Sequence, residues 1–469
     1  MTKKFFVSIL PKILFSTRTG GLLLFVFAVS MAIATFIEND YGTETAKAVV
    51  YSAKWFEIVM LLLAINFAGN IAKYNLWSWR KTPILLFHLA FIIIILGAGI
   101  TKYRGYEGLM TIKEGESTGQ IISMDSYVQL RAQKGAFIQN FVSHPLLLSE
   151  IGSNTYTETF TIEDKEIAVE LSRYVPKAQY TVENSKFGKA HLHLVLTNNQ
   201  ERKDFYIEKG TREVIYGIPV AFEYEHPLHK DISIQNDHGT WKVRFPEDTN
   251  YFNMVENRAS FYPADSLVPL QFKALSQIGN TSIVFNTVRE NVIRTLTTNE
   301  QPTEKKNSES AVVLTVRSGS ETKKITLFGG KGYVNPFSSL FINGIHLDFR
   351  YGSKPIPLPF SVRLRDFVLE RYPGSDSPSA FYSHVAVADQ ENTFDYTLFM
   401  NNVMNYKGYR FFQSAYTPDE KGTVLSVNKD YWGTRTTYLG YGLLGLGMLL
   451  SIFWKGSHFE FLYQLLKTS

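Results

Sequence analysis

Four apolar segments constrain this chain more than any other feature of its sequence. They run over residues 20–37, 55–74, 83–101 and 438–454. Each is free of charged side chains except near an edge, and each approaches the roughly 20 residues that a helix needs to cross a bilayer. Because hydrocarbon offers no partner for backbone N–H and C=O groups, each segment is expected to be a helix. The sequence therefore predicts a membrane protein with three transmembrane helices near its N-terminus and a fourth near its C-terminus.

The long polar region at residues 102–437 has the alternation of apolar and polar side chains that is typical of β-strands. The pattern is clear at residues 167–175, 312–316 and 362–367, and no long amphipathic helix stands out. We expect one or two antiparallel β-sandwich units here, with a flexible polar insertion at residues 298–309. The predicted fold class is an α + β membrane protein, in which four transmembrane helices carry a large extracytoplasmic antiparallel β-rich domain.

Positive charges predict the orientation. They lie before the first span, between the second and third spans, and after the fourth, at Lys3, Lys4, Lys12, Arg18, Lys73, Arg80, Lys81, Lys455 and Lys467. By the positive-inside bias both termini are predicted to be cytoplasmic. The expected divisions are a cytoplasmic tail at 1–19, a three-helix region at 20–101, a periplasmic domain at 102–437, a fourth helix at 438–454 and a cytoplasmic tail at 455–469.

Charge and cysteine content exclude several classes of function. The chain has no cysteine, so disulfides, thiol redox chemistry and thiolate ligation of metals or haem are excluded. A net charge of +5 on 469 residues is mild and does not indicate nucleic-acid binding. The expected environment is the lipid bilayer of an inner (cytoplasmic) membrane.

His88 is the strongest candidate for chemistry, because it lies within the uncharged third span. An imidazole in lipid is costly, so it is expected to face another helix, a cavity or a cofactor. Histidine is a common axial ligand of haem iron. The alternative is a hydrogen bond to a neighbouring helix and no further role. The segment alone leaves both interpretations open.

Asn66 and Asn70 place further polar groups near the same side of the membrane. They lie one turn apart on the second span, at depths of roughly 10 and 5 Å, and His88 lies about 7–8 Å inside on the third. One of these asparagines is predicted to accept a hydrogen bond from Nδ1–H of His88, which leaves Nε2 free for a ligand. An ordinary interhelical hydrogen bond is the competing interpretation.

The polar region contains one pair of histidines with regular spacing. His191 and His193 are predicted to share one face of a strand, with Leu192, Leu194 and Leu196 on the other. A metal site with a third ligand is one interpretation, and a solvated strand face is the favoured one. No serine–histidine–acid arrangement or phosphate-binding glycine loop is found, so no catalytic residue is predicted.

Several motifs resemble the ResB (CcsB-type) family of system II cytochrome c biogenesis proteins. They are residues 101–108 (TKYRGYEG), 112–116 (IKEGE), 372–375 (YPGS), 406–414 (YKGYRFFQS) and 419–423 (DEKGT). The similarity extends from about Leu14 to Trp454. It implies that His88 matches the third-helix histidine that ligates haem in this family. Some relatives carry a histidine just before the last span, where this chain has Lys429.

The resemblance also implies a cofactor, a partner and a reaction. Haem b is expected to be held transiently and shared with a CcsA-type membrane protein, and then attached covalently to apocytochrome c. The chain ends soon after its fourth span, so we expect it to supply only part of the haem site and to act within a haem lyase complex, without catalysis by itself. The competing hypothesis is a membrane-tethered binding or assembly scaffold without haem ligation.

Overall fold

The computed structural model describes residues 10–135, 137–198, 201–215, 217–254, 256–279, 281–299, 309–390, 392–455, 460 and 466. The insertion predicted at 298–309 lies largely outside these residues, as do residues 1–9 and most of the predicted C-terminal tail. The chain divides into two compact units. The helix-bearing unit comprises Met1–Tyr127, Ser143–Thr155 and Gly352–Ser469, and the all-β unit comprises Val128–Val142 and Tyr156–Tyr351.

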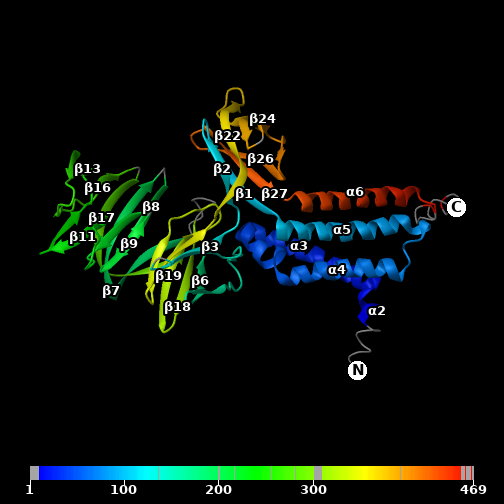
Figure 1. The fold of residues 1–469 in the computed structure, drawn as a ribbon, viewed down its shortest axis with the longest axis horizontal. Coiled ribbons are helices and arrows are strands. Elements are labelled where there is room, and N and C mark those ends of the chain that lie inside the picture. Colours follow the sequence, from blue (N-terminus) through cyan, green and yellow to red (C-terminus); the bar gives the residue numbers. More distant parts are fainter. Residues whose placement is uncertain are drawn as a thin grey trace. The chain divides into compact units, whose positions relative to one another are not determined.

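The helix-bearing unit contains four helices that are long and apolar enough to cross a membrane. The helical elements described are α2 (Leu10–Leu14), α3 (Thr17–Ala46), a π-helical segment (Lys47–Tyr51), α4 (Lys54–Lys73), a 3₁₀ turn (Trp79–Lys81), α5 (Thr82–Arg104) and α6 (Tyr431–Phe453). The prediction of three N-terminal spans and one C-terminal span is confirmed. Figure 1 shows α5 and α6, which are far apart in sequence, lying side by side.

The fourth helix begins at Tyr431, about two turns before the predicted start at residue 438. Residues 431–437 include Arg435 and three threonines, so their composition does not indicate a span. The helix begins there because the carboxylate of Asp430 accepts hydrogen bonds from Thr101 Oγ1 at 2.6 Å and Thr434 Oγ1 at 3.2 Å. These two bonds tie the start of α6 to the end of α5.

Glycines let α5 and α6 approach closely. Gly433, Gly440 and Gly447 recur every seven residues on α6 and face α5. A Cβ atom at Gly440 would lie 2.6 Å from Ile94 Cγ1 and 3.1 Å from the Ala90 carbonyl oxygen. Close packing of small residues is a main source of helix association where lipid removes the hydrophobic driving force.

We expect Gly440→Leu to destabilise the α5–α6 pair by about 1–3 kcal/mol, because the added side chain has no space between the helices. Gly442→Leu is the matched control, since a Cβ at Gly442 meets nothing within 4 Å. Thermal unfolding of the two detergent-solubilised variants would measure the difference. Equal midpoints would contradict close α5–α6 packing.

A carboxylate joins α4 and α5 at the ends that adjoin the β-region. Glu57 accepts from Lys54 Nζ at 2.9 Å, Lys102 Nζ at 2.6 Å and the Tyr103 hydroxyl at 3.0 Å. The second span therefore carries its acidic residue at a helix end, where lysine heads and a tyrosine hydroxyl neutralise it.

An eight-stranded antiparallel sheet completes the helix-bearing unit. Its order is β24 (Thr393–Phe399), β23 (Pro378–Ala388), β22 (Pro355–Arg371), β2 (Ser117–Ser123), β1 (Tyr106–Lys113), β27 (Gly422–Lys429), β26 (Tyr409–Tyr416) and β25 (Met404–Tyr406). One core contains Met110, Val362, Leu398 and Phe411. The end strands also meet, since the rings of Phe394 and Tyr406 lie 5.0 Å apart.

The polypeptide enters and leaves this sheet through neighbouring strands. β1 follows α5 and β27 precedes α6, and the two strands pair from Tyr106↔Lys429 to Lys113↔Gly422. The pairing therefore brings the ends of the third and fourth spans together, although they are far apart in sequence.

The all-β unit contains four sheets among the described residues. The six-stranded sheet is β14 (Arg258–Tyr262), β13 (Thr249–Asn253), β16 (Ala274–Ile278), β17 (Thr281–Thr298), β7 (Ala178–Asn198) and β8 (Glu201–Glu208). The five-stranded sheet is β15 (Val268–Pro269), β12 (Thr240–Arg244), β11 (Ile232–Asp237), β10 (Ile218–Phe222) and β9 (Thr211–Ile215). These two sheets share one core.

Two four-stranded sheets make up the rest of this unit. One is β19 (Glu321–Gly329), β18 (Ser310–Ser318), β6 (Lys165–Val175) and β5 (Thr157–Ile162). The other is β20 (Ser338–Ile342), β21 (Ile345–Gly352), β3 (Tyr127–Lys134) and β4 (Phe137–Val142). The antiparallel β-rich domain is confirmed, and within it β10 and β11 pair in parallel.

Candidate functional site

His88 lies about two turns from the start of α5, and its ring is half-buried against α4. The edge of the imidazole meets Phe67, with ring centroids 5.5 Å apart and an interplanar angle of 88°. Phe67 in turn stacks on Phe91, at 5.2 Å. The imidazole therefore sits among aromatic rings, a surrounding that suits a flat apolar ligand.

The hydrogen bond of His88 determines which nitrogen is free. Nδ1 lies 2.9 Å from the carbonyl oxygen of Ile84, one turn earlier on the same helix. A carbonyl can only accept, so the proton belongs on Nδ1 and Nε2 keeps its lone pair. Among the described residues Nε2 has no hydrogen-bond partner. This is the tautomer that a neutral histidine needs to ligate a metal through Nε2.

The predicted role of the asparagines is not what the structure shows. Asn66 Nδ2 donates to the carbonyl oxygens of Leu14 at 2.5 Å and Ser16 at 3.1 Å, and Asn70 Nδ2 donates to Asn66 Oδ1 at 2.9 Å. Both side chains are buried. The two asparagines hold the segment before α3 against α4, and Ile84 takes the place that an asparagine was expected to have beside His88.

Phe67 was not singled out from the sequence, although it contacts His88. It lies next to Asn66 and one turn before Asn70, and it is 9% exposed. A signal was present: the other aromatic residues of the second span lie at its ends, and Phe67 is the one near the depth predicted for His88.

A second polar cluster lies where the third and fourth spans enter the sheet. The hydroxyls of Tyr106 and Tyr409 are 2.9 Å apart, and Lys429 Nζ donates to the Tyr409 hydroxyl at 3.1 Å. Burial and the hydrogen bond to Tyr409 raise the pKa of Tyr106. Lys429 also lies over the Tyr409 ring, 4.2 Å from its centroid. The ammonium group of Lys429, just before the fourth helix, is thus held by a tyrosine.

His191 and His193 lie on β7, with Leu192, Leu194 and Leu196 buried in the core on the other face, as predicted. The expected solvated face is wrong, because His191 is only 2% exposed and His193 12%. Strand β8 pairs beside them in the sheet and places Glu208 opposite His191 and Tyr206 opposite His193. His193 stacks on the ring of Tyr206 at 4.5 Å, and its Nε2 lies 2.7 Å from Asp204 Oδ1.

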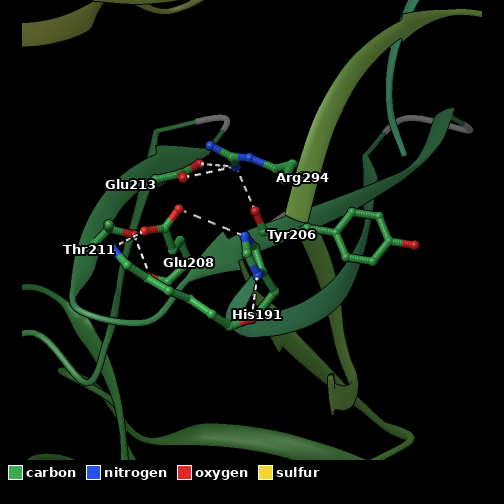
Figure 2. Close-up of polar contacts among 7 residues, drawn as sticks. His191, Tyr206, Glu208, Thr211, Glu213 and Arg294 are labelled. Atoms are coloured by element: carbon green, nitrogen blue, oxygen red, sulfur yellow. Dashed lines mark hydrogen bonds and ion pairs between the residues drawn. The ribbon is translucent and has the colours of Figure 1, made fainter. Parts of the chain in front are cut away.

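Figure 2 shows the surroundings of His191. Its Nε2 is buried without a hydrogen bond, 3.9 Å from Glu208 Oε2. Nearby, Arg294 donates to Glu213 Oε1 at 2.9 Å and to the carbonyl oxygen of Tyr206 at 2.5 Å. These contacts join β17, β8 and β9. The described residues contain no group of three histidine or carboxylate side chains that could hold a metal ion, so the metal interpretation of this pair has no third ligand.

Comparison with known proteins agrees with the motifs. Residues 328–443 match the model of the ResB-like family. Over this segment the chain resembles the ResB-like family. The matched segment runs from the end of β19 into α6, and it contains three of the motifs on which the resemblance was based, at 372–375, 406–414 and 419–423.

A relative extends the similarity over the whole chain. Protein NrfI of Wolinella succinogenes is 30% identical over 460 residues, which is 98% of this chain and 37% of that protein. The ResB-like chain thus spans little more than a third of the length of this curated relative. The aligned region covers α5 and His88 as well as the segment matched by the family model.

Proposed function

We propose that this chain handles haem in cytochrome c biogenesis. It holds haem during export through the membrane and presents it, with a CcsA-type partner, for covalent attachment to apocytochrome c. The match of residues 328–443 to the ResB-like family and the similarity to Protein NrfI support the general role. The His88 imidazole supports the haem-handling step. The CcsA-type partner belongs either to the same polypeptide or to a separate one.

The observation that carries this proposal is the free Nε2 of His88. The lone pair is available because Ile84 engages Nδ1, and the ring lies beside Phe67 on an apolar helix. An imidazole with no function in lipid would be expected to use both nitrogens, since an unsatisfied polar group there is costly. A ligand at Nε2 is a direct way to satisfy the second nitrogen.

Haem fits this position as cargo. Its faces are apolar, and its iron accepts imidazole nitrogen as an axial ligand. This chain offers His88 for one face, so the ligand on the other face comes from the CcsA-type partner. Because the two axial ligands come from this chain and from the CcsA-type partner, haem can be released when the two separate.

We further propose that the helix-bearing unit lies in the inner membrane with its β-sheet on the periplasmic side. Lys12 and Arg18 precede α3, and Lys73, Arg80 and Lys81 lie between α4 and α5. With alternating spans these positions fall on one side, which the positive-inside bias assigns to the cytoplasm. The outward ends of α5 and α6 then lead into β1 and out of β27.

Absorption spectra test the proposal. The chain is purified with a CcsA-type partner and, in parallel, without it, and each preparation is reduced with dithionite. We expect the complex to carry b-type haem with bis-imidazole bands, and the chain alone to carry much less. A complex that supports cytochrome c maturation but contains no haem would contradict haem handling and support the scaffold hypothesis.

A further inference from the structure

Two arginines share one face of the sheet β20-β21-β3-β4 in the all-β unit. On β3, Leu130 and Ala132 are buried, so Arg131 lies on the opposite face. On β21, Leu347 and Phe349 are fully buried, so Arg350 also lies opposite the core. Since β3 and β21 are neighbours, the two side chains meet on one surface.

An aromatic ring brings the two guanidinium groups together. The Cζ atoms of Arg350 and Arg131 lie 4.5 and 5.5 Å from the centroid of the Phe337 ring. We call these three residues the arginine pair and its ring. Cations over a ring face are stabilised by its quadrupole, but the ring does not neutralise their charge.

The partners of both arginines are neutral. Arg131 Nε donates to Asn140 Oδ1 at 3.4 Å, and an Nη of Arg350 donates to Gln129 Oε1 at 2.6 Å. Nε of Arg350 is buried without an acceptor. Neither guanidinium forms an ion pair with a carboxylate in the part of the chain that the structure describes. Burial, together with the charge of Arg131, lowers the pKa of Arg350.

The carboxylate closest in sequence on this face is already engaged. Asp348 Oδ1 accepts from Ser339 Oγ at 2.7 Å and lies 3.6 Å from His346 Nδ1. Arg350 is partly withdrawn from water without a counter-charge, which is costly, and the exposed Arg131 places a second like charge beside it. A carboxylate from outside the chain would supply the missing charge, and guanidinium groups bind carboxylates with good geometry.

The same face ends at an open sheet edge. β4 is the last strand of its sheet, and Phe137 and Ile138 are 64% and 60% exposed. Val142 is 48% exposed. Sheet edges in proteins are usually protected by lysine, proline, bulges or a covering segment. The β4 sequence FIQNFV contains neither lysine nor proline. Such an edge suits an extended polypeptide that adds as a further strand.

We propose that β4 accepts an extended segment of another polypeptide as an added strand. Arg131, whose guanidinium group lies beside that of Arg350 on the Phe337 ring, selects segments with carboxylate side chains. Arg131 extends toward β4, where it bonds its cross-strand neighbour Asn140, and a glutamate on the next strand can extend to meet it. Ile138 and Val142, on the same face as Asn140, contribute apolar contact. The inference does not depend on haem ligation at His88, so either can fail alone.

Binding of two synthetic peptides to the full chain in detergent tests the selection. One fluorescent peptide alternates glutamate with valine, and the other has glutamine in place of glutamate. We expect the glutamate peptide to bind at least about tenfold more tightly, with an advantage that falls as salt is added. The double variant R131Q/R350Q removes this advantage. Arg317→Gln on β18, whose partner is Glu170 at 3.0 Å, is the control and leaves it unchanged.

A cross-link tests whether the peptide binds at β4. Because the chain has no cysteine, Ile138→Cys creates a unique thiol, which we expect to form a disulfide with a cysteine-bearing glutamate peptide. Phe261→Cys is the control, since Phe261 is 56% exposed on β14, the edge of another sheet. The cross-link and the comparison of the two peptides on the unmodified chain both test the inference even if R131Q/R350Q fails to fold.

Three results would overturn the inference. The first is equal affinity for the glutamate and glutamine peptides. The second is cross-linking at residue 261 as efficient as at residue 138. The third is an Ile138→Cys thiol that resists labelling in the free chain, or that links chain to chain, because the edge is then already covered by this protein itself.

Discussion

Replacing His88 with glycine is expected to remove haem from the complex with the CcsA-type partner and to stop cytochrome c maturation. The substitution deletes the proposed axial ligand and leaves a space beside Phe67 that free imidazole can enter. Haem content is expected to fall at least about tenfold, since even indirect changes to metal ligands cost 10–100-fold in affinity. Haem per protein, measured by pyridine haemochrome, and covalent haem in a reporter cytochrome c give the result.

Imidazole in the growth medium is expected to restore both signals in the glycine variant. This rescue separates loss of a ligand from loss of the fold. His384→Gly is the control, because His384 lies on β23 with Nδ1 near Thr397 Oγ1 at 2.9 Å. Full haem and full maturation in His88→Gly would refute the ligand role of His88.

Asp231→Ala is expected to destabilise the all-β unit by about 3–5 kcal/mol, because removing one partner of a buried ion pair leaves the other charge uncompensated. The Asp231 side chain is fully buried and Arg212 is 23% exposed. Nε and an Nη of Arg212 donate to Asp231 at 2.8 Å each, and the backbone N–H of Leu228 donates at 2.8 Å. Chemical denaturation followed by tryptophan fluorescence would measure the loss.

Acid should reveal the same ion pair in the unmodified protein. Burial alone would raise the pKa of Asp231, but hydrogen bonds from Arg212 and Leu228 hold it below its usual value. A carboxyl group with a lowered pKa stabilises the fold above its unfolded pKa of about 3.9, and this contribution disappears as pH falls through the folded value. As the pH falls below about 3.9, the free energy of unfolding is therefore expected to decrease less in Asp231→Ala than in the unmodified protein.

Glu170→Ala is the control for this prediction. Glu170 pairs with Arg317 in the same unit, but the two side chains are 46% and 57% exposed, and such surface pairs contribute less than about 1 kcal/mol. Equal effects of the two substitutions would show that the Arg212–Asp231 pair has no special weight in the fold.

The spans were predictable because lipid imposes a length and a composition that are visible in sequence. The residues at which the helices begin and end were less predictable. The start of α6 at Tyr431 depends on Asp430 meeting Thr101, two residues that are far apart in the chain. The β character of the polar region followed from alternation, but alternation does not say which strands pair. The parallel β10–β11 pair and the interleaved units depend on those pairings.

The candidate site shows the same division. His88 could be singled out from one segment, because an imidazole in an uncharged span is unusual wherever the helix packs. The hydrogen-bond partner of His88 could not be predicted in this way. Asn66 is unavailable to His88 because it bonds Leu14 and Ser16, and it does so only because the segment before α3 folds back against α4. The surroundings of His191 likewise depend on which strand pairs with β7, since β8 places Glu208 opposite it.

By itself, the sequence determined four helices able to span a membrane, a β-rich region between the third and fourth, and an imidazole within an uncharged helix, because each rests on local composition and spacing. Tertiary structure alone decided that Nδ1 of His88 bonds Ile84, that β1 pairs with β27, and that Arg131 and Arg350 meet around Phe337. The physical reason is that in each of these contacts a group pairs with one of several partners that its chemistry would allow. A residue's partners depend on how the backbone folds over long distances, and several partners would satisfy the same side chain equally well.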